Sequence, residues 1–307
     1  VQLHVIKGKT TLIAGDRSNR VNLEVSAGHA KKVSAATQEV SDIHCERELF
    51  VRDINSDHKY VWKGQLTLDL ADIAGGGNGL GTGRLYTGIN PVTGRTTSLH
   101  FDNRKATNEY RLVASNSFID GVFIPNGRTE QIISSRNHIF QECPITTGDL
   151  WTDIISMPVS PEKEWKPEGI SNRGQLVQGA NPDSTEEGLL MHANLGITFD
   201  LQAIRSMLPD AKITRFRSQF GLAPFDEEMI NADFWVLVDG KLKFKQTQVK
   251  ERGKAGLIDI ELSDTDRFLT LVTTDGGDPE GRISHNRIIR TINGDWCVFV
   301  EPTLVLK

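Results

Sequence analysis

The sequence has few of the residues that mark metal proteins, disulfide-rich proteins or membrane proteins. Its 307 residues include only three cysteines, Cys45, Cys143 and Cys297, and no two have the CxxC spacing of a zinc or redox motif. Two arrangements stay open: one disulfide with one buried thiol, or three buried thiols. No run of eighteen or more apolar residues is present. The sequence therefore predicts no membrane-spanning helix.

Catalytic motifs are also missing. There is no GxSxG elbow for a serine nucleophile and no HExxH pair, and the eight histidines are scattered along the chain. His192 is expected to be a structural residue with satisfied hydrogen bonds rather than a ligand. The glycine-dense segment 75–83 lacks both Gly-Lys-Ser/Thr and the GxGxxG spacing, so we expect a flexible surface loop and no nucleotide site. These absences together predict that the protein is not an enzyme.

The composition favours a β protein without nucleic acid as its partner. The net charge of −5 argues against a nucleic-acid partner, because such a partner requires a basic face. A hydrophobic content of 38% with 28 glycines is typical of a loop-rich, all-β globular protein. At this length the chain can form one large domain or two medium ones.

Alternation of apolar and polar residues predicts how the chain is divided. Residues 1–45 form short alternating runs separated by glycine turns, which predicts a small N-terminal β-meander, and the charged residues 46–59 predict a linker. We expect residues 60–307 to form a β-sandwich. Residues 60–187 would supply its first strands and a long insertion, and 188–307 its core module. Whether 60–187 is a separate domain stays open at this stage.

Two details of that region are specific enough to test. The alternating segment 60–70 predicts one strand, and segment 151–183, rich in Pro, Lys and Glu with little periodicity, predicts a long surface connection.

The segment ANLGITFDLQAIR, followed by TRFRSQFGL, predicts a strand, a short helix that ends before Pro209, and a second strand over 213–220. This order resembles the NPCBM family of carbohydrate-binding modules. Segment 233–245 resembles the family's hairpin with an Asp-Gly-Lys turn, 258–278 its two penultimate strands, and 295–306 its closing strand. The resemblance implies an all-β, jelly-roll or galactose-binding-like β-sandwich in an exported or cell-surface protein.

A second resemblance lies near the N-terminus. The segment VSAGHAKKVSA resembles the end of FecR-type domains, with His29 where that family usually has an acidic or polar residue. FecR-like segments precede NPCBM-like modules in cell-envelope proteins, which is consistent with the order here.

The resemblance and the aromatic residues suggest where a sugar would bind. Sugars are held by aromatic faces surrounded by polar groups, and Trp296 with Asp295 matches the family's Asp-Trp position. We therefore consider Trp235, Trp296 and Asp295 as ligand-binding residues. The alternative is that both tryptophans belong to the core, because they lie in predicted strands.

Calcium is the one candidate cofactor. Jelly-roll modules often bind this ion near a strand end through carboxylates and carbonyls, and Asp275, Asp278 and Glu301, together with Asp295, are the best candidates. The alternative is a polar hairpin whose aspartates cap the turn.

These observations predict a non-catalytic β-sandwich protein that recognises carbohydrate of a cell envelope or matrix. The alternative is a self-assembling subunit, a homo-oligomer of a filament or surface layer, whose N-terminal strands complete a neighbour's sheet. The chain begins at Val1 without an initiator Met, so we expect a processed or trimmed form of an extracellular or cell-surface protein.

Overall fold

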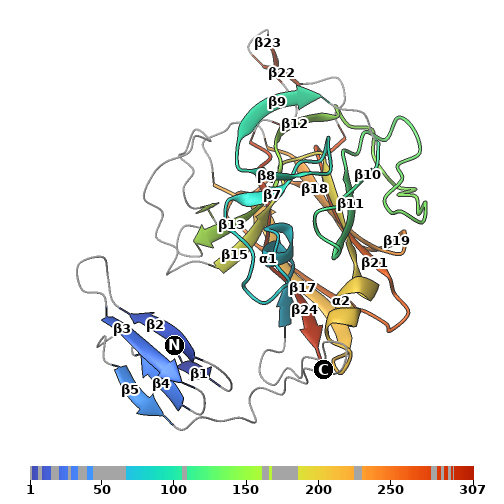
Figure 1. Cartoon of the computed structure of the whole chain (residues 1–307). Coiled ribbons are helices and arrows are strands. Elements are labelled where there is room, and N and C mark those ends of the chain that lie inside the picture. Colours follow the sequence, from blue (N-terminus) through green and yellow to red (C-terminus); the bar gives the residue numbers. More distant parts are fainter. Residues whose placement is uncertain are drawn as a thin grey trace. The chain divides into compact units, whose positions relative to one another are not determined.

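The chain forms two compact units, Val1–Gly64 and Gln65–Lys307 (Figure 1). The computed structural model describes residues 2–5, 9–14, 21–26, 29–33, 40–43, 67–105, 109–160, 166–167, 186–224, 230–277, 282–284, 287–289, 292 and 294–307. The predicted linker over 46–59, residues 60–66 of the predicted strand, and Cys45 lie outside these residues.

The first unit is built from five strands. A three-stranded sheet contains β1 (Gln2–Val5), β4 (His29–Val33) and β5 (Val40–Ile43), and a hairpin contains β2 (Lys9–Ala14) and β3 (Val21–Ser26). All pairings are antiparallel. The predicted run of strands is present, but its order is not that of a simple meander, because β1 pairs with β4 rather than with β2.

The second unit is a sandwich of two antiparallel sheets, so the predicted all-β sandwich is confirmed. The six-stranded sheet has the order β10 (Arg111–Leu112), β11 (Ile119–Phe123), β16 (Leu195–Asp200), β21 (Phe268–Thr274), β18 (Ala232–Val238), β19 (Lys241–Val249). The nine-stranded sheet runs β20 (Gly256–Glu261), β17 (Ile213–Leu222), β24 (Cys297–Leu306), β15 (Glu186–Leu190), β13 (Ile154–Ser160), β7 (Thr87–Ile89), β8 (Thr96–Ser98). Strand β6 (Thr67–Asp69) also pairs with β24, and β14 (Lys166–Pro167) with β13.

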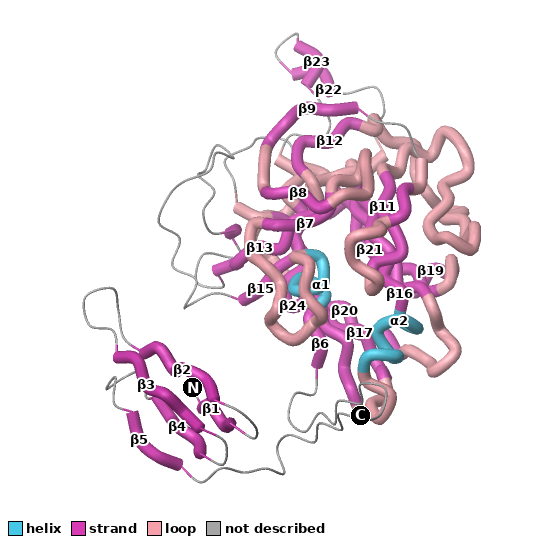
Figure 2. The backbone as a smooth tube through the Cα atoms, viewed as in Figure 1, coloured by secondary structure: helices cyan, strands magenta, loops and turns pink. Residues whose placement is uncertain are grey.

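The remaining elements are short. Strands β9 (Phe101–Lys105) and β12 (Asp149–Thr152) form a pair, as do β22 (Arg282–Ser284) and β23 (Arg287–Ile289). The helices are α1 (Leu70–Ala74) and α2 (Leu201–Met207), and Figure 2 shows how little of the chain they occupy. Within the described residues, no helix is long and apolar enough to cross a membrane.

Aromatic side chains join the two sheets. Phe234 of β18 lies in the six-stranded sheet, and its ring centroid is 4.8 Å from that of Phe220 and 5.5 Å from that of Phe299, both in the nine-stranded sheet. Phe234 and Phe299 are fully buried. Because side chains alternate along a strand, Val236 and Val238 point into the same core.

The opposite face of β18 is also buried. Trp235 and Leu237 pack with Phe140 and Ile133 in a second apolar cluster on the outer side of the six-stranded sheet. Phe140 and Ile133 belong to segment 124–148, which we call the outer loop; it follows β11 and contains no named strand. A strand covered on both faces favours apolar residues on both sides, and ADFWVLV is apolar apart from Asp233, whose buried carboxylate accepts hydrogen bonds from Gln248 N and Thr274 Oγ1.

Strand β16 and helix α2 occur where the sequence predicts them. Asp200 ends the strand and begins the helix, because its carboxylate accepts hydrogen bonds from Gln202 N (2.9 Å) and Ala203 N (3.1 Å). The predicted second strand, the Asp-Gly hairpin of β18 and β19, and the closing strand β24 are present as well.

Two local predictions differ from the structure. Of the predicted strand 60–70, residues 67–69 form β6, but Leu70 begins helix α1 instead of ending the strand. The predicted surface connection 151–183 contains β13 at its start, and every residue of this strand is buried between β15 and β7. The ladder between β13 and β7 ends at Ser156, so Pro158, which has no N–H, requires no partner on that side.

The glycine-dense segment 75–83 is not a free surface loop. It folds around the buried carboxylate of Asp72, which accepts hydrogen bonds from Gly79 N (2.6 Å) and Gly83 N (2.5 Å). A Cβ atom at Gly77 or Gly83 would clash with Asp72. The loop is therefore glycine-rich because its backbone closes on a carboxylate of the chain itself.

We expect Phe234→Ala to lower the free energy of unfolding of the sandwich by about 3–5 kcal/mol, because it leaves a cavity between the two sheets. Urea denaturation followed by tryptophan fluorescence would measure the change. Leu257→Ala is the matched control, since Leu257 is 77% exposed and its loss should change stability by less than about 0.5 kcal/mol. Equal effects of the two substitutions would contradict the packing described here.

Candidate functional site

The tryptophans considered as sugar platforms are both buried. Trp235 and Trp296 are each 4% exposed. The Trp235 ring packs edge-on against Phe140, and its Nε1 donates to Thr274 Oγ1 at 3.0 Å. Trp296 packs edge-on against Phe101 and His192. In this conformation neither ring offers an open face on which a sugar could stack. This agrees with the alternative that both tryptophans belong to the core.

Burial also decides the chemistry of His192. Removal from water lowers the pKa of its ring to about 3, so the ring is neutral at physiological pH. Its Nδ1 atom is buried and has no hydrogen-bond partner among the described residues, so the expectation of satisfied hydrogen bonds does not hold for this atom there. His192 is thus a structural residue that packs against Trp296.

Asp295 and Asp275 belong to a buried polar cluster, which we define as Thr147, Asn194, Asn231, Asp233, Asp275 and Asp295. Asp275 Oδ2 accepts from Thr147 N (2.9 Å), Thr147 Oγ1 (2.9 Å) and Asn194 Nδ2 (3.1 Å). Asp295 Oδ1 accepts from Asn231 N at 2.9 Å. Burial raises the pKa of Asp233, and the charge of Asp275 raises it further.

The three residues suggested for calcium are not brought together in what the structure describes. Asp275 follows β21 in the six-stranded sheet, Glu301 is an exposed residue of β24 in the nine-stranded sheet, and Asp278 lies outside the described residues. Among the described residues, no group of three or more His, Cys, Asp or Glu side chains is arranged to hold a metal. Two buried amide oxygens of the polar cluster, Asn194 Oδ1 and Asn231 Oδ1, have no hydrogen-bond partner. Calcium binding at this cluster stays a prediction.

If calcium binds beside Asp275, millimolar calcium should raise the melting temperature of the EDTA-treated protein by a few degrees, because a ligand of the folded state stabilises it. Magnesium should have a smaller effect, since it dehydrates reluctantly. Glu301→Gln should keep the response and Asp275→Asn should lose it. An equal melting temperature in calcium and EDTA, measured by scanning calorimetry, would exclude the ion.

A pair of carboxyl groups lies at the start of helix α1. Burial, followed by a hydrogen bond and charge repulsion from Glu187, raises the pKa of Asp69 to about 8. The Asp69 side chain also caps the helix by accepting from Ala71 N at 2.7 Å. Glu187 lies in β15, so the protonated pair links β6 to the middle of the nine-stranded sheet.

We expect this pair to make the sandwich less stable as the pH rises. Between about pH 4 and pH 8 the folded protein keeps a proton that the unfolded chain loses, so stability falls with pH across this window, by at most about 1.4 kcal/mol per pH unit. Asp69→Asn keeps the helix cap and should flatten the profile measured by denaturation at pH 5 to 8.5. Asp264→Asn, at a 66% exposed side chain, is the control. Parallel profiles for wild type and Asp69→Asn would contradict the shared proton.

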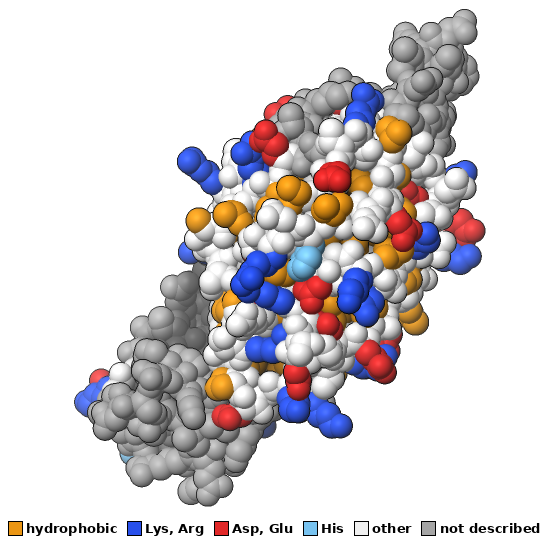
Figure 3. Space-filling view, turned by 90° about the vertical axis from the view of Figure 1, so that its right-hand side faces the viewer, with side chains coloured by type: hydrophobic (Ala, Val, Ile, Leu, Met, Phe, Trp, Pro, Cys, Tyr) orange, Lys and Arg blue, Asp and Glu red, His pale blue; other side chains and the backbone are white. Residues whose placement is uncertain are grey.

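The described surface has a hollow beside β10, of about 630 Å³, which we call the Tyr110 hollow. Residues of β10 and its approach line one side, and the outer loop lines the other. Its apolar walls are Leu112 and Ile132, two of the four large hydrophobic side chains that the described part of the chain exposes, at 64% and 37%. Figure 3 views the face on the right of Figure 1, where hydrophobic side chains reach the surface among charged ones.

Tyr110 is held in a fixed orientation in this hollow. Its hydroxyl donates to Asp120 Oδ2 at 2.5 Å, and the same oxygen accepts from Ser135 N at 2.7 Å. Burial raises the pKa of the tyrosine, and the Asp120 carboxylate adds to this, so the hydroxyl keeps its proton. The ring lies against Gly121, where any Cβ atom would clash with it. The half-buried ring therefore combines a fixed aromatic surface with nearby polar groups.

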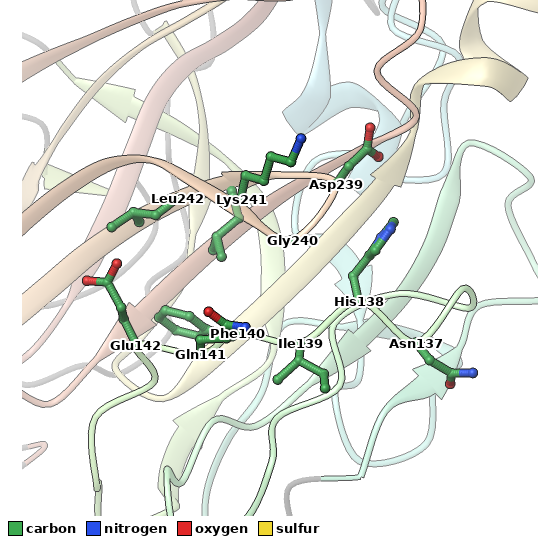
Figure 4. Close-up of a pocket in the computed structure, with 11 residues that line it drawn as sticks. Asn137, His138, Ile139, Phe140, Gln141, Glu142, Asp239, Gly240, Lys241 and Leu242 are labelled. Atoms are coloured by element: carbon green, nitrogen blue, oxygen red, sulfur yellow. The ribbon is translucent and has the colours of Figure 1, made fainter.

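A second hollow, of about 410 Å³, lies between the outer loop and the turn of the β18–β19 hairpin, and we call it the Phe140 hollow (Figure 4). Ile139, Phe140, Leu237 and Leu242 are its apolar lining, and Asn137 lines both hollows. The two acidic side chains at this hollow already have partners. Glu142 pairs with Lys245 at 2.8 Å, and Asp239 accepts from the backbone nitrogens of Arg267 and Phe268.

Sequence reasoning did not single out Tyr110 from the other aromatic residues. Its neighbours in the hollow come from the outer loop, which has no regular periodicity to place it. The sequence also does not predict that Leu112 and Ile132 are exposed, because their exposure depends on which surfaces the outer loop leaves uncovered. Both described cysteines, Cys143 and Cys297, are free thiols, and burial raises the pKa of Cys143 to about 12.

Part of the chain matches a known family. Residues 167–289, about two fifths of the chain, match the family model of the NPCBM/NEW2 domain. This supports the NPCBM resemblance for that region and a carbohydrate-binding, non-catalytic type of module. The match includes β18, β19 and the turn at the Phe140 hollow, but not Tyr110 or the outer loop. No curated protein matches the chain.

Several solved structures are similar over parts of the chain. The CBM51 module of a GH95 protein from Clostridium perfringens, solved with methyl-galactose, is 12% identical, with 68% of this chain and 100% of the module covered and a TM-score of 0.30. The tandem CBM51 modules of Sp3GH98 from Streptococcus pneumoniae are 16% identical, with 50% and 41% covered and a TM-score of 0.30. The CBM51-2 and INT domains of Clostridium perfringens ZmpB, solved with GlcNAc, are 9% identical, with 90% and 36% covered and a TM-score of 0.30. This chain thus spans less than half of the latter two structures.

Proposed function

We propose that the protein is a non-catalytic, exported or cell-surface protein that recognises carbohydrate of a cell envelope or matrix, and that the sugar binds in the Tyr110 hollow. The observation that carries this proposal is a fixed, half-buried aromatic ring beside exposed apolar walls and a polar rim. The match of residues 167–289 to the NPCBM/NEW2 domain supports carbohydrate as the ligand class.

The geometry suits a sugar better than a purely apolar ligand. A pyranose ring has an apolar face of C–H groups and an edge of hydroxyls, so it requires an apolar surface next to hydrogen-bonding groups. Tyr110 and Leu112 provide the surface, and Ser135 and Asn137 lie at the same hollow. Its volume lies within the range of about 300–1,000 Å³ that is common for small-molecule sites.

We expect Tyr110→Ala to abolish carbohydrate binding and Tyr110→Phe to keep most of it, because the ring rather than the hydroxyl faces the sugar. A glycan array with the full chain would identify ligands, and isothermal titration would give the dissociation constants. The proposed position of the sugar would be wrong if Tyr110→Ala folded normally by circular dichroism and bound the sugar as tightly as wild type.

Two exposed leucines in the part of the chain that the structure describes provide a matched pair. Leu112→Ala should weaken binding about five- to tenfold, since a bound sugar would cover this side chain, whereas Leu257→Ala, the same change at a leucine outside the hollow, should have no effect. Equal affinities of the two variants would place the sugar elsewhere on the molecule.

A further inference from the structure

Resting on the proposed function, we propose that the site binds an interior stretch of a polysaccharide chain, which enters the Tyr110 hollow, crosses Asn137 and continues into the Phe140 hollow. The alternative for the same surface is recognition of one terminal sugar in a single hollow. The two differ in how many sugar units contribute to binding.

The first step of the argument is that the two hollows adjoin. Asn137 lines both, and the residues on either side of it divide between them, with Ser134 and Ser135 at the Tyr110 hollow and His138 and Ile139 at the Phe140 hollow. They therefore lie on opposite sides of one turn of the outer loop. A ligand that follows the surface from one to the other must pass over this turn.

The second step is that the turn is rigid. Asn137 N donates to Ser134 O at 3.0 Å, and Ser134 Oγ accepts from Arg136 N and His138 N, each at 3.2 Å. The same hydroxyl also bonds His138 Nδ1 at 3.0 Å, and Ile133 N donates to His138 O at 2.9 Å. A turn fixed by five hydrogen bonds loses little conformational entropy when a ligand lies across it.

The third step concerns the exposed side chain of Asn137. Asn137 closes the turn through the bond from its N–H to Ser134 O, its backbone has a positive φ of 59°, and its side chain is exposed. The amide group makes no hydrogen bond within the described part of the chain, so both its donor and its acceptor are available to a ligand. An amide that lies between the two hollows can form hydrogen bonds with hydroxyl groups in the middle of a glycan chain.

The fourth step is that the hollows share one kind of lining. Accessible aliphatic side chains line each hollow, Leu112 and Ile132 in one and Ile139 and Leu242 in the other, and Phe140 lies buried beneath the second. In Figure 4 Phe140 lies between Glu142 and Ile139 on the outer loop, and Lys241 and Asp239 lie on the hairpin opposite. Asp239 and Glu142 have partners within the chain, whereas Lys241 forms no ion pair with another described residue. Two adjoining sites of similar chemistry fit a repeating ligand.

The test measures how affinity depends on chain length. The full-length protein would be applied to an array that carries neutral and acidic polysaccharide fragments, each as a series of one to six units. We expect affinity to rise with length until both hollows are filled and then to level off. Binding that is complete with a single terminal sugar would overturn this inference but leave the proposed function intact. Binding to no glycan at all would overturn both.

Two substitutions locate the crossing and the second hollow. Asn137→Gly removes the amide while glycine keeps the positive φ, so affinity for the longest fragments should fall about five- to tenfold, and by more than the affinity for single sugars, because only a long fragment lies across the turn. Lys241→Ala, at a residue outside the Tyr110 hollow, should weaken only the long fragments. Lys243→Ala is its matched control, because Lys243 is equally an exposed lysine of β19 but does not line the hollow. Equal effects of Lys241→Ala and Lys243→Ala, or no effect of Asn137→Gly on long fragments, would contradict the path.

Discussion

The sandwich depends on one strand that is covered on both faces. On its inner face, β18 directs Phe234 between the rings of Phe220 and Phe299, and this contact joins the two sheets. On its outer face, Trp235 and Leu237 hold the outer loop through Phe140. The same seven residues thus build the main core and anchor the loop that shapes both hollows. The surface we assign to carbohydrate is therefore as firmly held as the core beneath it.

The sequence predicted the parts of the fold that local chemistry specifies. Asp200 and Pro209 bound α2, and Asp239 with Gly240 forms the turn of the β18–β19 hairpin, because capping and turn residues act within a few positions along the chain. Strand β13 was missed because it has no alternation and contains a proline. Only its neighbours β7 and β15, both distant in sequence, reveal that it is buried on both faces.

The candidate site was harder to predict for the same reason. Both tryptophans were predicted to lie in strands; Trp235 does, and Trp296 directly precedes β24. Whether the outer face of β18 is open depends on the outer loop rather than on the strand. Tyr110 is distinguished from the other aromatic residues by its contacts with Asp120 and Gly121, which fix its ring and which the sequence alone does not predict. The FecR-like segment, calcium binding and self-assembly through the N-terminal strands remain predictions from the sequence.

The glycine loop around Asp72 has a consequence for how this sequence can vary. A side chain at Gly77 or Gly83 would collide with Asp72 and open the loop, and the carboxylate would then lose the backbone donors Gly79 N and Gly83 N that compensate its burial. Neither partner can change alone without a large loss of stability. Among relatives of this chain, the aspartate and its glycines should therefore be inherited or replaced as a set, which makes their covariation a marker of this loop where overall similarity is low.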